Sequence, residues 1–383
     1  MAKKRLYWQP WMTKITVLLF FACVLALAAG AVTFVQLEDP PNEIVVIHSY
    51  KEEFWVTDLE IRGLRRAFAA ESIPVRIRQA YMDAKSQVWN DLTERERVQS
   101  SKNVADDVLN LRPKLVMIFD DAALKYVGPF LKNRQIPVVF AGINGDPNDY
   151  GIFDRSVDIT KREISGNNMT GVLERIPFEA GFRLFKEIVG EARDLRIYTD
   201  PELSSQVTRE QLLQGALAAG IRISSKHFVV VREFTDLQSH VIKANEDPSV
   251  DAVILYLPWA LNADHRTVVR WFLKNNRKPD IGFTQIMGED GMLCGAFADM
   301  ELQGYYAGLI ASVILKGEKL PGDIPIYDRV PKKTFINIAR ARAIGIDRQI
   351  PFRRLREVDL RYSEMRLDPD LILNTPKSRG DRE

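Results

Sequence analysis

Residues 43–60 read EIVVIHSYKEEFWVTDLE, and this stretch decides the fold of the chain. The β-branched run at residues 44–47 is typical of a buried strand, the polar and aromatic residues 48–55 are typical of a loop, and a helix is predicted after them. A strand, a loop and a helix in this order open a doubly wound α/β domain, whose ligands bind where the strands end. The loop contains no glycine. We therefore do not expect a dinucleotide ligand, because glycine is what lets backbone amides approach a phosphate.

The compartment is indicated by the residues before this strand. Residues 15–35 carry no charge and follow a basic segment, residues 1–14, which is predicted to be cytoplasmic. An apolar helix of this length spans roughly 30 Å, the thickness of a bilayer core. Everything after it is then extracytoplasmic, in the periplasm. Two alternatives stay open for residues 15–35: an uncleaved anchor in the inner membrane, and a signal peptide cleaved near Ala29-Gly30-Ala31.

Composition narrows the classes of protein. The 383 residues carry a net charge of +2, which is too balanced to predict a nucleic-acid partner. The two cysteines are Cys23, inside the apolar segment, and Cys294. The exported body therefore has no intramolecular disulfide and needs an ordinary apolar core. Its length is more than one core usually covers, so we expect two domains.

Strands and helices are predicted to alternate along the first half of the body. Helix starts are indicated by two capping boxes, Thr57 with Glu60 and Thr93 with Glu96. The run LVMIF is continuous and apolar, as expected for a buried parallel strand. The strands predicted here are residues 44–47, 74–77, 115–119 and 137–140.

A second set of strands and helices follows a polar, glycine-bearing stretch. Its predicted strands are residues 194–200, 227–231, 251–257 and 280–284, and its helices lie near 177–190, 204–219, 235–246 and 261–275. Two such sets predict an α/β fold of two Rossmann-like lobes. We assign lobe 1 to residues 43–165 plus about 290–360, lobe 2 to residues 166–289, a hinge near 165–170 and 284–290, and a flexible tail to 363–383.

Several segments carry a resemblance to a known family. They are IVVIHSY (44–50), YMDAKS (81–86), LVMIFDDAALKYV (115–127), IPVVFAGIN (136–144), MTGVLE (169–174), ILKGEKLPGDIPI (314–326) and FINIARARAIGIDRQIP (335–351). In this order they resemble the ABC-type periplasmic solute-binding proteins, and more narrowly the extracytoplasmic ABC-type sensor domains of bacterial histidine kinases. The resemblance covers residues 44–360. It implies a periplasmic-binding-protein fold, in which two hinged lobes close on a small ligand.

The loops after the strands of both lobes are where a shared cleft is expected. Hydroxyls, amides and helix N-termini there can hold a carboxylate, Asp120 or Asp121 can pair with an ammonium group, and aromatic rings can cover an apolar body. This set of groups suits an amino acid or a similar small organic solute. The candidate ligand-binding residues are His48, Ser49, Tyr50, Trp55, Asp120, Asp121, Gly142 and Asn144 in the first lobe, and Thr199, Asp200, Ser204, Ser205, Tyr256, Trp259 and Gln285 in the second.

Structural roles are the alternatives for many of these residues. Trp55 and Tyr256 also suit core packing, and His48 suits a hydrogen-bonded structural imidazole. The paired aspartates and the paired serines stand at predicted helix starts, where N-capping alone can explain them. The chain also departs from the relatives at two places, Lys51-Glu-Glu-Phe before Trp55 and Asp120-Asp121-Ala122-Ala123 in place of Asp-Asp-Asn-Ala. We therefore transfer no ligand specificity from the family.

Neither catalysis nor a bound metal or other cofactor is predicted. The four histidines, His48, His227, His240 and His265, lack the close spacing of a metal-binding helix, and no nucleophile elbow, Walker loop or dinucleotide fingerprint occurs. Two functions remain open. The first, which we favour, is delivery of a small solute to an ABC permease. The second is a membrane-anchored sensory module that signals to a separate histidine kinase or cyclase.

Overall fold

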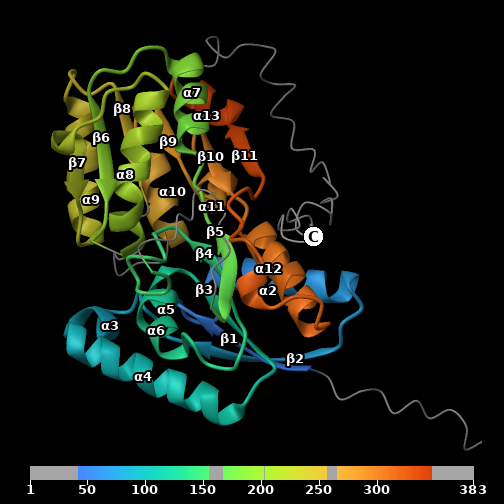
Figure 1. Cartoon of the computed structure of the whole chain (residues 1–383). Coiled ribbons are helices and arrows are strands. Elements are labelled where there is room, and N and C mark those ends of the chain that lie inside the picture. Colours follow the sequence, from blue (N-terminus) through green and yellow to red (C-terminus); the bar gives the residue numbers. More distant parts are fainter. Residues whose placement is uncertain (1–41, 155–166, 202, 257–264, 347–383) are drawn as a thin grey trace, which may run out of the picture. The chain divides into compact units, whose positions relative to one another are not determined.

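The computed structural model describes residues 42–154, 167–201, 203–256 and 265–346. Predictions for residues 1–14, 15–35 and 363–383, and for Trp259, fall outside these ranges. Within the described ranges, no helix is both long and apolar enough to cross a bilayer. The described residues form two β-sheets, one of five strands and one of six, each with helices packed on both faces (Figure 1).

The first sheet is built from the amino-terminal strands in the order β2-β1-β3-β4-β5. All of its pairs are parallel, and Ile44 lies opposite Ile77 on one side and Leu115 on the other. Parallel strands put their carboxyl ends at one edge, so the loops after them meet there. The strands are β1 (Asn42–His48), β2 (Val75–Tyr81), β3 (Leu115–Phe119), β4 (Val138–Ile143) and β5 (Met169–Leu173).

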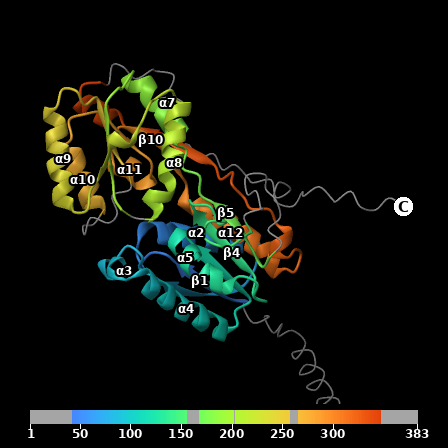
Figure 2. The ribbon, with the colours of Figure 1, turned by 60° about the vertical axis from the view of Figure 1, so that its left-hand side comes forward.

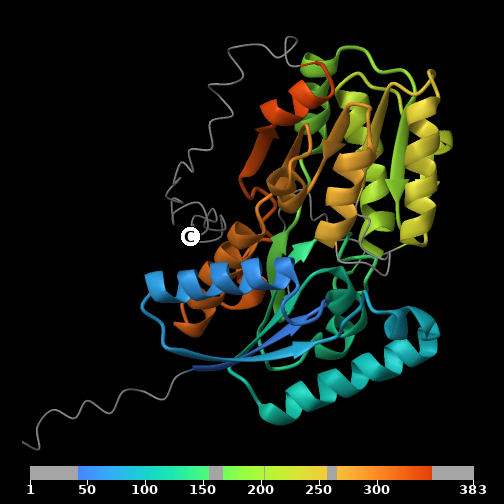
Figure 3. The same ribbon diagram turned by 180° about the vertical axis from the view of Figure 1, so that it is seen from behind.

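Alternate residues of these strands face two separate layers of helices. Val46 packs with Leu64 of α2 and Ile310 of α12, whereas Ile47 packs with Val108 of α4 on the opposite face. The helices α2 and α12 lie side by side, as the views from the front and from behind agree (Figures 1 and 3). The helices of this lobe are α2 (Trp55–Ala70), α3 (Gln87–Asp91), α4 (Glu94–Leu111), α5 (Asp121–Tyr126), α6 (Gly128–Leu131) and α12 (Met300–Leu315), and a 3₁₀ turn, η3 (Pro321–Asp323), follows α12.

The second sheet has the strand order β11-β10-β9-β8-β6-β7. Its strands are parallel except for β11, which pairs antiparallel with β10 at the edge. The four strands predicted for this half are confirmed in place as β6 to β9, and the structure adds β10 and β11, which were not predicted here. The strands are β6 (Leu195–Thr199), β7 (Phe228–Val230), β8 (Ala252–Leu255), β9 (Asp280–Gly282), β10 (Cys294–Ala298) and β11 (Lys332–Ile336).

Helices also cover this sheet on both faces. Ile254 packs with Phe182 of α7, and Val253 on the other face packs with Val241 of α9 and Phe272 of α10. Figure 2 shows α9 and α10 together beside this sheet, with α7 and α8 apart from them. The helices are α7 (Phe178–Val189), α8 (Leu203–Ala218), α9 (Phe234–Glu246), α10 (His265–Asn275), α11 (Gln285–Asp290) and α13 (Ile338–Ala343), with a 3₁₀ turn, η2 (Ser225–His227).

The chain passes between the two sheets at places that differ from the predicted lobe boundaries. In the described residues it crosses after β5, in residues 174–177, again at Asp299 between β10 and α12, and again in residues 328–331 before β11. The predicted boundaries put β5 in lobe 2 and put β10 and β11 in lobe 1. Strand membership is set by hydrogen-bond partners far away in sequence, so local pattern did not reveal it.

One of the two predicted capping boxes is wrong and the other is confirmed. The helix α2 begins at Trp55, and Thr57 and Glu60 are buried inside it. In α4 the Thr93 backbone N–H donates to Glu96 Oε2 over 2.8 Å and the Glu96 N–H donates to Thr93 Oγ1 over 3.3 Å. The sequence T-x-x-E therefore marks a helix start only where the side chains stay at the surface. Glu60 instead lies at the close contact of α2 with α12, where a Cβ on Gly304 would come within 2.0 Å of the Glu60 carbonyl oxygen.

Candidate ligand-binding site

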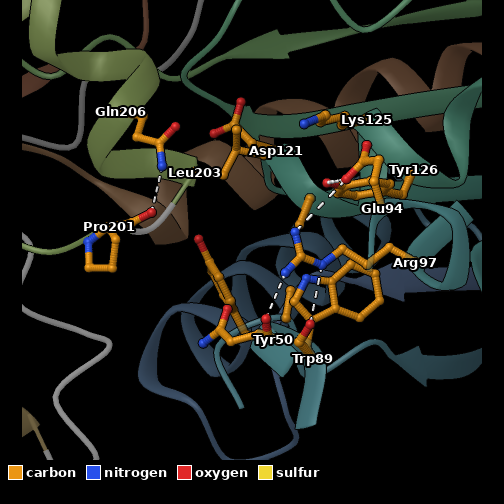
Figure 4. Close-up of a pocket in the computed structure, with 13 residues that line it drawn as sticks. Tyr50, Trp89, Glu94, Arg97, Asp121, Lys125, Tyr126, Pro201, Leu203 and Gln206 are labelled. Carbon is orange, nitrogen blue, oxygen red and sulfur yellow. Dashed lines mark hydrogen bonds and ion pairs between the residues drawn. The ribbon is translucent and has the colours of Figure 1, made fainter. Parts of the chain in front are cut away.

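A cavity of about 210 Å³ is lined by residues of both lobes (Figure 4). This volume is below that of pockets for drug-sized ligands and suits one small solute. The cavity lies against the loop after β1, the helices α3 to α5 and the start of α8. Its lining residues are Tyr50, Ala84, Trp89, Asn90, Glu94, Arg97, Asp121, Ala122, Lys125 and Tyr126 in the first lobe, and Pro201, Leu203 and Gln206 in the second.

Aromatic rings form much of the first-lobe wall. The rings of Trp89 and Tyr126 meet edge to face with centroids 5.4 Å apart, and Tyr50 lies on the same side of the cavity (Figure 4). The Tyr126 hydroxyl donates to Glu94 Oε2 over 2.9 Å. Arg97 is held in place because its guanidinium donates to the carbonyl oxygens of Trp89, over 3.2 Å, and Asn90, over 2.9 Å. This wall is rigid and amphipathic, which suits an apolar ligand body with polar ends.

Charged groups of both signs border the cavity. Asp121 accepts hydrogen bonds from the N–H of Gly145 over 2.9 Å, the N–H of Asn144 over 3.2 Å and the Tyr150 hydroxyl over 2.8 Å. Burial raises the pKa of Asp121, and these bonds act in the opposite direction by stabilising the carboxylate. Lys125 lies with its ammonium group 4.8 Å from the centre of the Tyr126 ring. An acidic and a basic side chain thus line one small cavity.

Behind Asp121 the strand ends carry a cluster of buried carboxyl groups. Glu60, Asp120 and Glu174 come from α2, the end of β3 and the end of β5, and each is buried. Burial, as the first cause, and the neighbouring carboxylates raise the pKa of each, that of Glu174 to about 8. Asp120 holds a backbone φ of 66°, in the left-handed region that non-glycine residues rarely adopt. Strain of this kind is typical of functional sites.

Asn144 joins this cluster to the second lobe. Its side-chain amide donates to Glu174 Oε2 over 2.8 Å, and its backbone carbonyl oxygen accepts from Gln211 Nε2 of α8 over 2.7 Å. Arg175 donates to the same carbonyl over 3.1 Å. Because Glu174 and Arg175 begin the first crossing between the lobes, Asn144 connects the binding edge to that crossing.

The remaining first-lobe candidates have structural contacts. His48 lies 3.1 Å from Gln79 Oε1 through its Nε2 and stacks on Tyr81 with ring centroids 5.1 Å apart, and burial lowers its pKa to about 4. Ser49 Oγ donates to the Phe119 carbonyl and accepts from the Ala123 N–H, over 2.9 and 2.8 Å. These bonds fix β1 against β3 and α5. Trp55 begins α2 and lies 6.3 Å from the ring of His265 in the second lobe.

Three of the second-lobe candidates contact one another near the end of β6, and the others have separate contacts. Ser205 donates to Asp200 Oδ1 over 2.6 Å, and Thr199 Oγ1 lies 3.4 Å from the Asp200 carbonyl. Tyr256 is fully buried in the core, and its hydroxyl is hydrogen-bonded to Thr208. Ser204 lies in α8, and Gln285 begins α11 and donates to Glu289 over 2.8 Å. The second lobe contributes to the cavity mainly through Pro201, Leu203 and Gln206.

Several residues of the site were not found from the sequence. Trp89, Arg97, Lys125 and Gln206 lie on helices, away from the strand ends that guided the search. Glu60 was hidden by its interpretation as a capping residue. Glu174 directly follows β5, and its position after a strand is the signal that could have identified it. No group of His, Cys, Asp and Glu side chains in the described ranges has an arrangement that holds a metal ion.

Two α/β lobes with a cavity between them are the architecture of the periplasmic-binding-protein fold. A sequence model of the family described as ABC transporter substrate binding protein matches residues 122–351. The chain therefore belongs to the ABC transporter substrate-binding protein family, as the resemblance of its segments indicated. Members of this family are extracytoplasmic binding proteins rather than enzymes, and they work with ABC permeases. No curated protein sequence matches the chain.

Several solved structures have a similar fold. An ABC domain in complex with L-Trp from Streptococcus pneumonia is 20% identical, with a TM-score of 0.63, and the match covers 82% of this chain and 99% of that one. A conserved domain protein from Vibrio cholerae is 18% identical, with a TM-score of 0.64 and coverage of 84% and 99%. A ligand-free, open substrate-binding protein with adhesive properties from Clostridium difficile is 17% identical, with a TM-score of 0.58 and coverage of 80% and 95%. At these identities the likeness concerns the fold.

Proposed function

We propose that this substrate-binding protein takes an amino-acid-like solute into the cavity between its lobes and delivers it to an ABC permease. The observation that carries the proposal is the placing of Asp121, Lys125 and three aromatic side chains around one cavity of about 210 Å³. A zwitterion can be bound by an acidic and a basic side chain at one small cavity, and an aromatic wall can cover its side chain. Asp121 is assigned to the ligand ammonium group and Lys125 to the carboxylate.

The predicted site residues take different parts in this proposal. Tyr50 and Asp121 line the cavity and are assigned to the ligand. Asp120, Gly142 and Asn144 lie behind Asp121 and set the shape and charge of the binding edge. The L-Trp complex of similar fold gives a reason to begin with aromatic amino acids. Its likeness extends to the fold, so the solute has to be found by measurement.

A thermal-shift screen of the purified protein tests the proposal. The compounds are the twenty amino acids, with small organic acids and sugars as comparison sets. A ligand present at a hundred times its dissociation constant stabilises the folded state by about 2.7 kcal/mol, so a binding amino acid raises the melting temperature clearly. A rise with sugars or organic acids and none with amino acids would refute the amino-acid assignment.

Two variants separate the roles of the charges for whichever amino acid binds. Lys125→Met should weaken binding of the amino acid but leave binding of its decarboxylated amine unchanged. Asp121→Asn should weaken binding of both, because both carry the ammonium group. Asp106→Asn is the matched control, since Asp106 lies on the exposed face of α4 and pairs with Lys102 there over 2.6 Å. Equal effects of all three variants would contradict the assigned roles.

The alternative function is a sensory module that signals to a separate membrane-bound kinase or cyclase. The feature that favours it is the uncharged segment at residues 15–35, which suits a permanent anchor directly before the binding body. Amino-terminal sequencing of the mature protein distinguishes the two. An intact segment in the membrane fraction supports a fixed sensor, whereas a start after residue 30 supports a released transport receptor.

A further inference from the structure

Two buried carboxyl groups lie close to the Cα atom of Gly142. A Cβ atom placed on Gly142 would lie 2.7 Å from Glu60 Oε1 and 3.0 Å from Asp120 Oδ1. Glu60 reaches this point from α2 and Asp120 from the end of β3, and their exposed fractions are 0% and 3%. The two carboxyl groups therefore share the space that the missing side chain of Gly142 leaves at the binding edge.

These carboxyl groups lack hydrogen-bond donors. Both carboxyl oxygens of Glu60 and Oδ2 of Asp120 accept no hydrogen bond from the described residues. Two ionised carboxylates in this position would be adjacent like charges in a medium of low polarity, which is strongly unfavourable. One proton shared between them removes one charge and supplies one donor. Paired carboxyl groups elsewhere hold a proton for this reason.

The neighbouring charges do not neutralise the pair. Glu174 and Asp121 raise the pKa of Asp120 further, after burial as the first cause, and Lys85 acts in the opposite direction. Arg175 directs its guanidinium to the carbonyl oxygens of Ile143, Asn144 and Glu174. The charged groups that act on the pair are Glu174 after β5, Asp121 of α5 and Lys85 after β2, and Arg175 acts in turn on Glu174.

We propose that Glu60 and Asp120 hold one proton between them, and that a ligand cation bound at the adjacent Asp121 expels it to solvent. The second half rests on the proposed function. In this step the O–H bond of the carboxyl pair breaks, its electron pair stays on the carboxylate oxygen, and water takes up the proton. The ammonium group of the ligand, bound at Asp121, takes the place of the positive charge that has left. Ligand binding is then coupled to proton release and weakens as pH falls. An acidic medium would lower the occupancy of the protein at a fixed solute concentration.

The shared proton is tested without any ligand, by unfolding in urea between pH 6.5 and 8.5. Above pH 6.5 an unfolded chain has ionised Glu and Asp side chains, so a folded state that keeps the proton loses stability as pH rises. Glu60→Gln supplies a permanent donor of the same shape. It should take up about one proton fewer on folding than the wild type and be the more stable protein at pH 8.5. The control is Asp58→Asn, an exposed position on the same helix, which should keep the wild-type pH slope.

Each outcome of this experiment either supports or contradicts a proton shared by Glu60 and Asp120. A wild-type stability that is independent of pH in this range overturns it, as does a Glu60→Gln variant that is destabilised equally at pH 6.5 and 8.5. Asp120→Asn should reproduce the Glu60→Gln change in slope, since removing either acid removes the sharing. If only one of these two variants changed the pH slope of the unfolding free energy and the other had no effect on it, the shared proton would also be contradicted.

The coupling is tested by titration calorimetry with L-tryptophan at pH 7 in phosphate and in Tris. Proton release makes the observed heat differ between the two buffers, because they take up protons with different enthalpies. The difference should disappear in Glu60→Gln. Equal heats for the wild type would overturn the coupling and leave the proposed function standing. Absence of any binding heat would instead count against the amino-acid assignment, while the unfolding slopes still decide the shared proton.

Discussion

Gln211 Nε2 lies 2.7 Å from the carbonyl oxygen of Asn144, and this hydrogen bond joins the helix α8 of the second lobe to the loop after β4 of the first. The side chain of the same Asn144 donates to Glu174, the first residue of a crossing between the lobes. A movement of the lobes at that crossing would therefore change the surroundings of Asn144. The proposed function implies that the lobes open and close, and this bond is a contact between them that such a movement would alter.

Gln211→Ala should shift the protein toward more open forms. A hydrogen bond of this kind contributes about 0.5–1.5 kcal/mol, enough to change a two-state population by up to roughly tenfold. Small-angle X-ray scattering should then show a larger average radius of gyration for the variant. Gln214→Ala on the same helix is the control, because the Gln214 amide donates over 3.1 Å to Glu210, an exposed contact within α8. Identical scattering of both variants and the wild type would refute a role for the Gln211 bond.

Gly142→Ala should lower the free energy of unfolding by more than Gly151→Ala, a substitution at another glycine with a similar positive φ. Gly142 has a φ of 72°, and the new methyl group would also press on the carboxyl groups of Glu60 and Asp120. Gly151 has a φ of 73° with nothing within 4 Å of a Cβ, so Gly151→Ala isolates the backbone cost of about 1 kcal/mol. We expect an additional loss of about 1–3 kcal/mol at Gly142, measured by urea unfolding. Equal losses at the two glycines would mean that the carboxyl groups simply move aside.

The two-lobed fold could be predicted because its strands are continuous apolar runs of the kind that parallel sheets need. Residues 115–119 and 252–255 are examples, and both are central strands in the structure. The assignment of β10 and β11 to the second sheet could not be predicted in this way. Cys294 pairs with Ile281 on one side and Ile336 on the other, and such long-range pairing leaves no trace in local periodicity.

The candidate site was predictable only where a strand end reaches it. Tyr50 and Asp121 directly follow β1 and β3, and both line the cavity. Trp89 and Arg97 are brought to the same cavity by the packing of α3 and α4, and nothing in their own sequence context marks them. Tyr256 also follows a strand, yet its ring packs in the apolar core, and its hydroxyl is hydrogen-bonded to Thr208 on a neighbouring helix. Position after a strand therefore selects candidates, and the tertiary packing decides among them.

His48 should make the protein acid-sensitive between about pH 6.5 and 4. Burial lowers its folded-state pKa to about 4 from an ordinary value of 6.5, so in this range the unfolded chain binds more protons than the folded one. Stability that is fully present above pH 6.5 is lost as pH falls toward 4, by a total on the order of 3 kcal/mol. His48→Gln cannot take up this proton. The difference in unfolding free energy between wild type and variant should therefore shrink toward low pH, and a constant difference would contradict the buried neutral imidazole.

Arg340 should be among the most costly positions to change outside the binding edge. Its guanidinium lies 2.6 Å from Asp280, is buried with it, and donates to the carbonyl oxygens of Leu273 and Asn276 over 2.9 Å each. Arg340→Met leaves the Asp280 charge buried without its partner, and breaking such a pair costs about 3–5 kcal/mol. Urea unfolding at pH 7 measures the loss. Lys102→Met is the control, since its exposed pair with Asp106 contributes only about 0.3–0.5 kcal/mol.

The pH dependence of the Arg340→Met variant identifies the cause of its instability. Burial raises the pKa of Asp280 and Arg340 lowers it, so removing the arginine leaves burial as the main influence. The variant should then hold a proton on Asp280 that the unfolded chain gives up, and it should lose stability as pH rises from about 4. Its deficit relative to wild type is therefore largest near neutral pH and smaller near pH 4.5. A deficit that stays constant across this range would attribute the loss to the missing packing and hydrogen bonds of the arginine rather than to the uncompensated charge of Asp280.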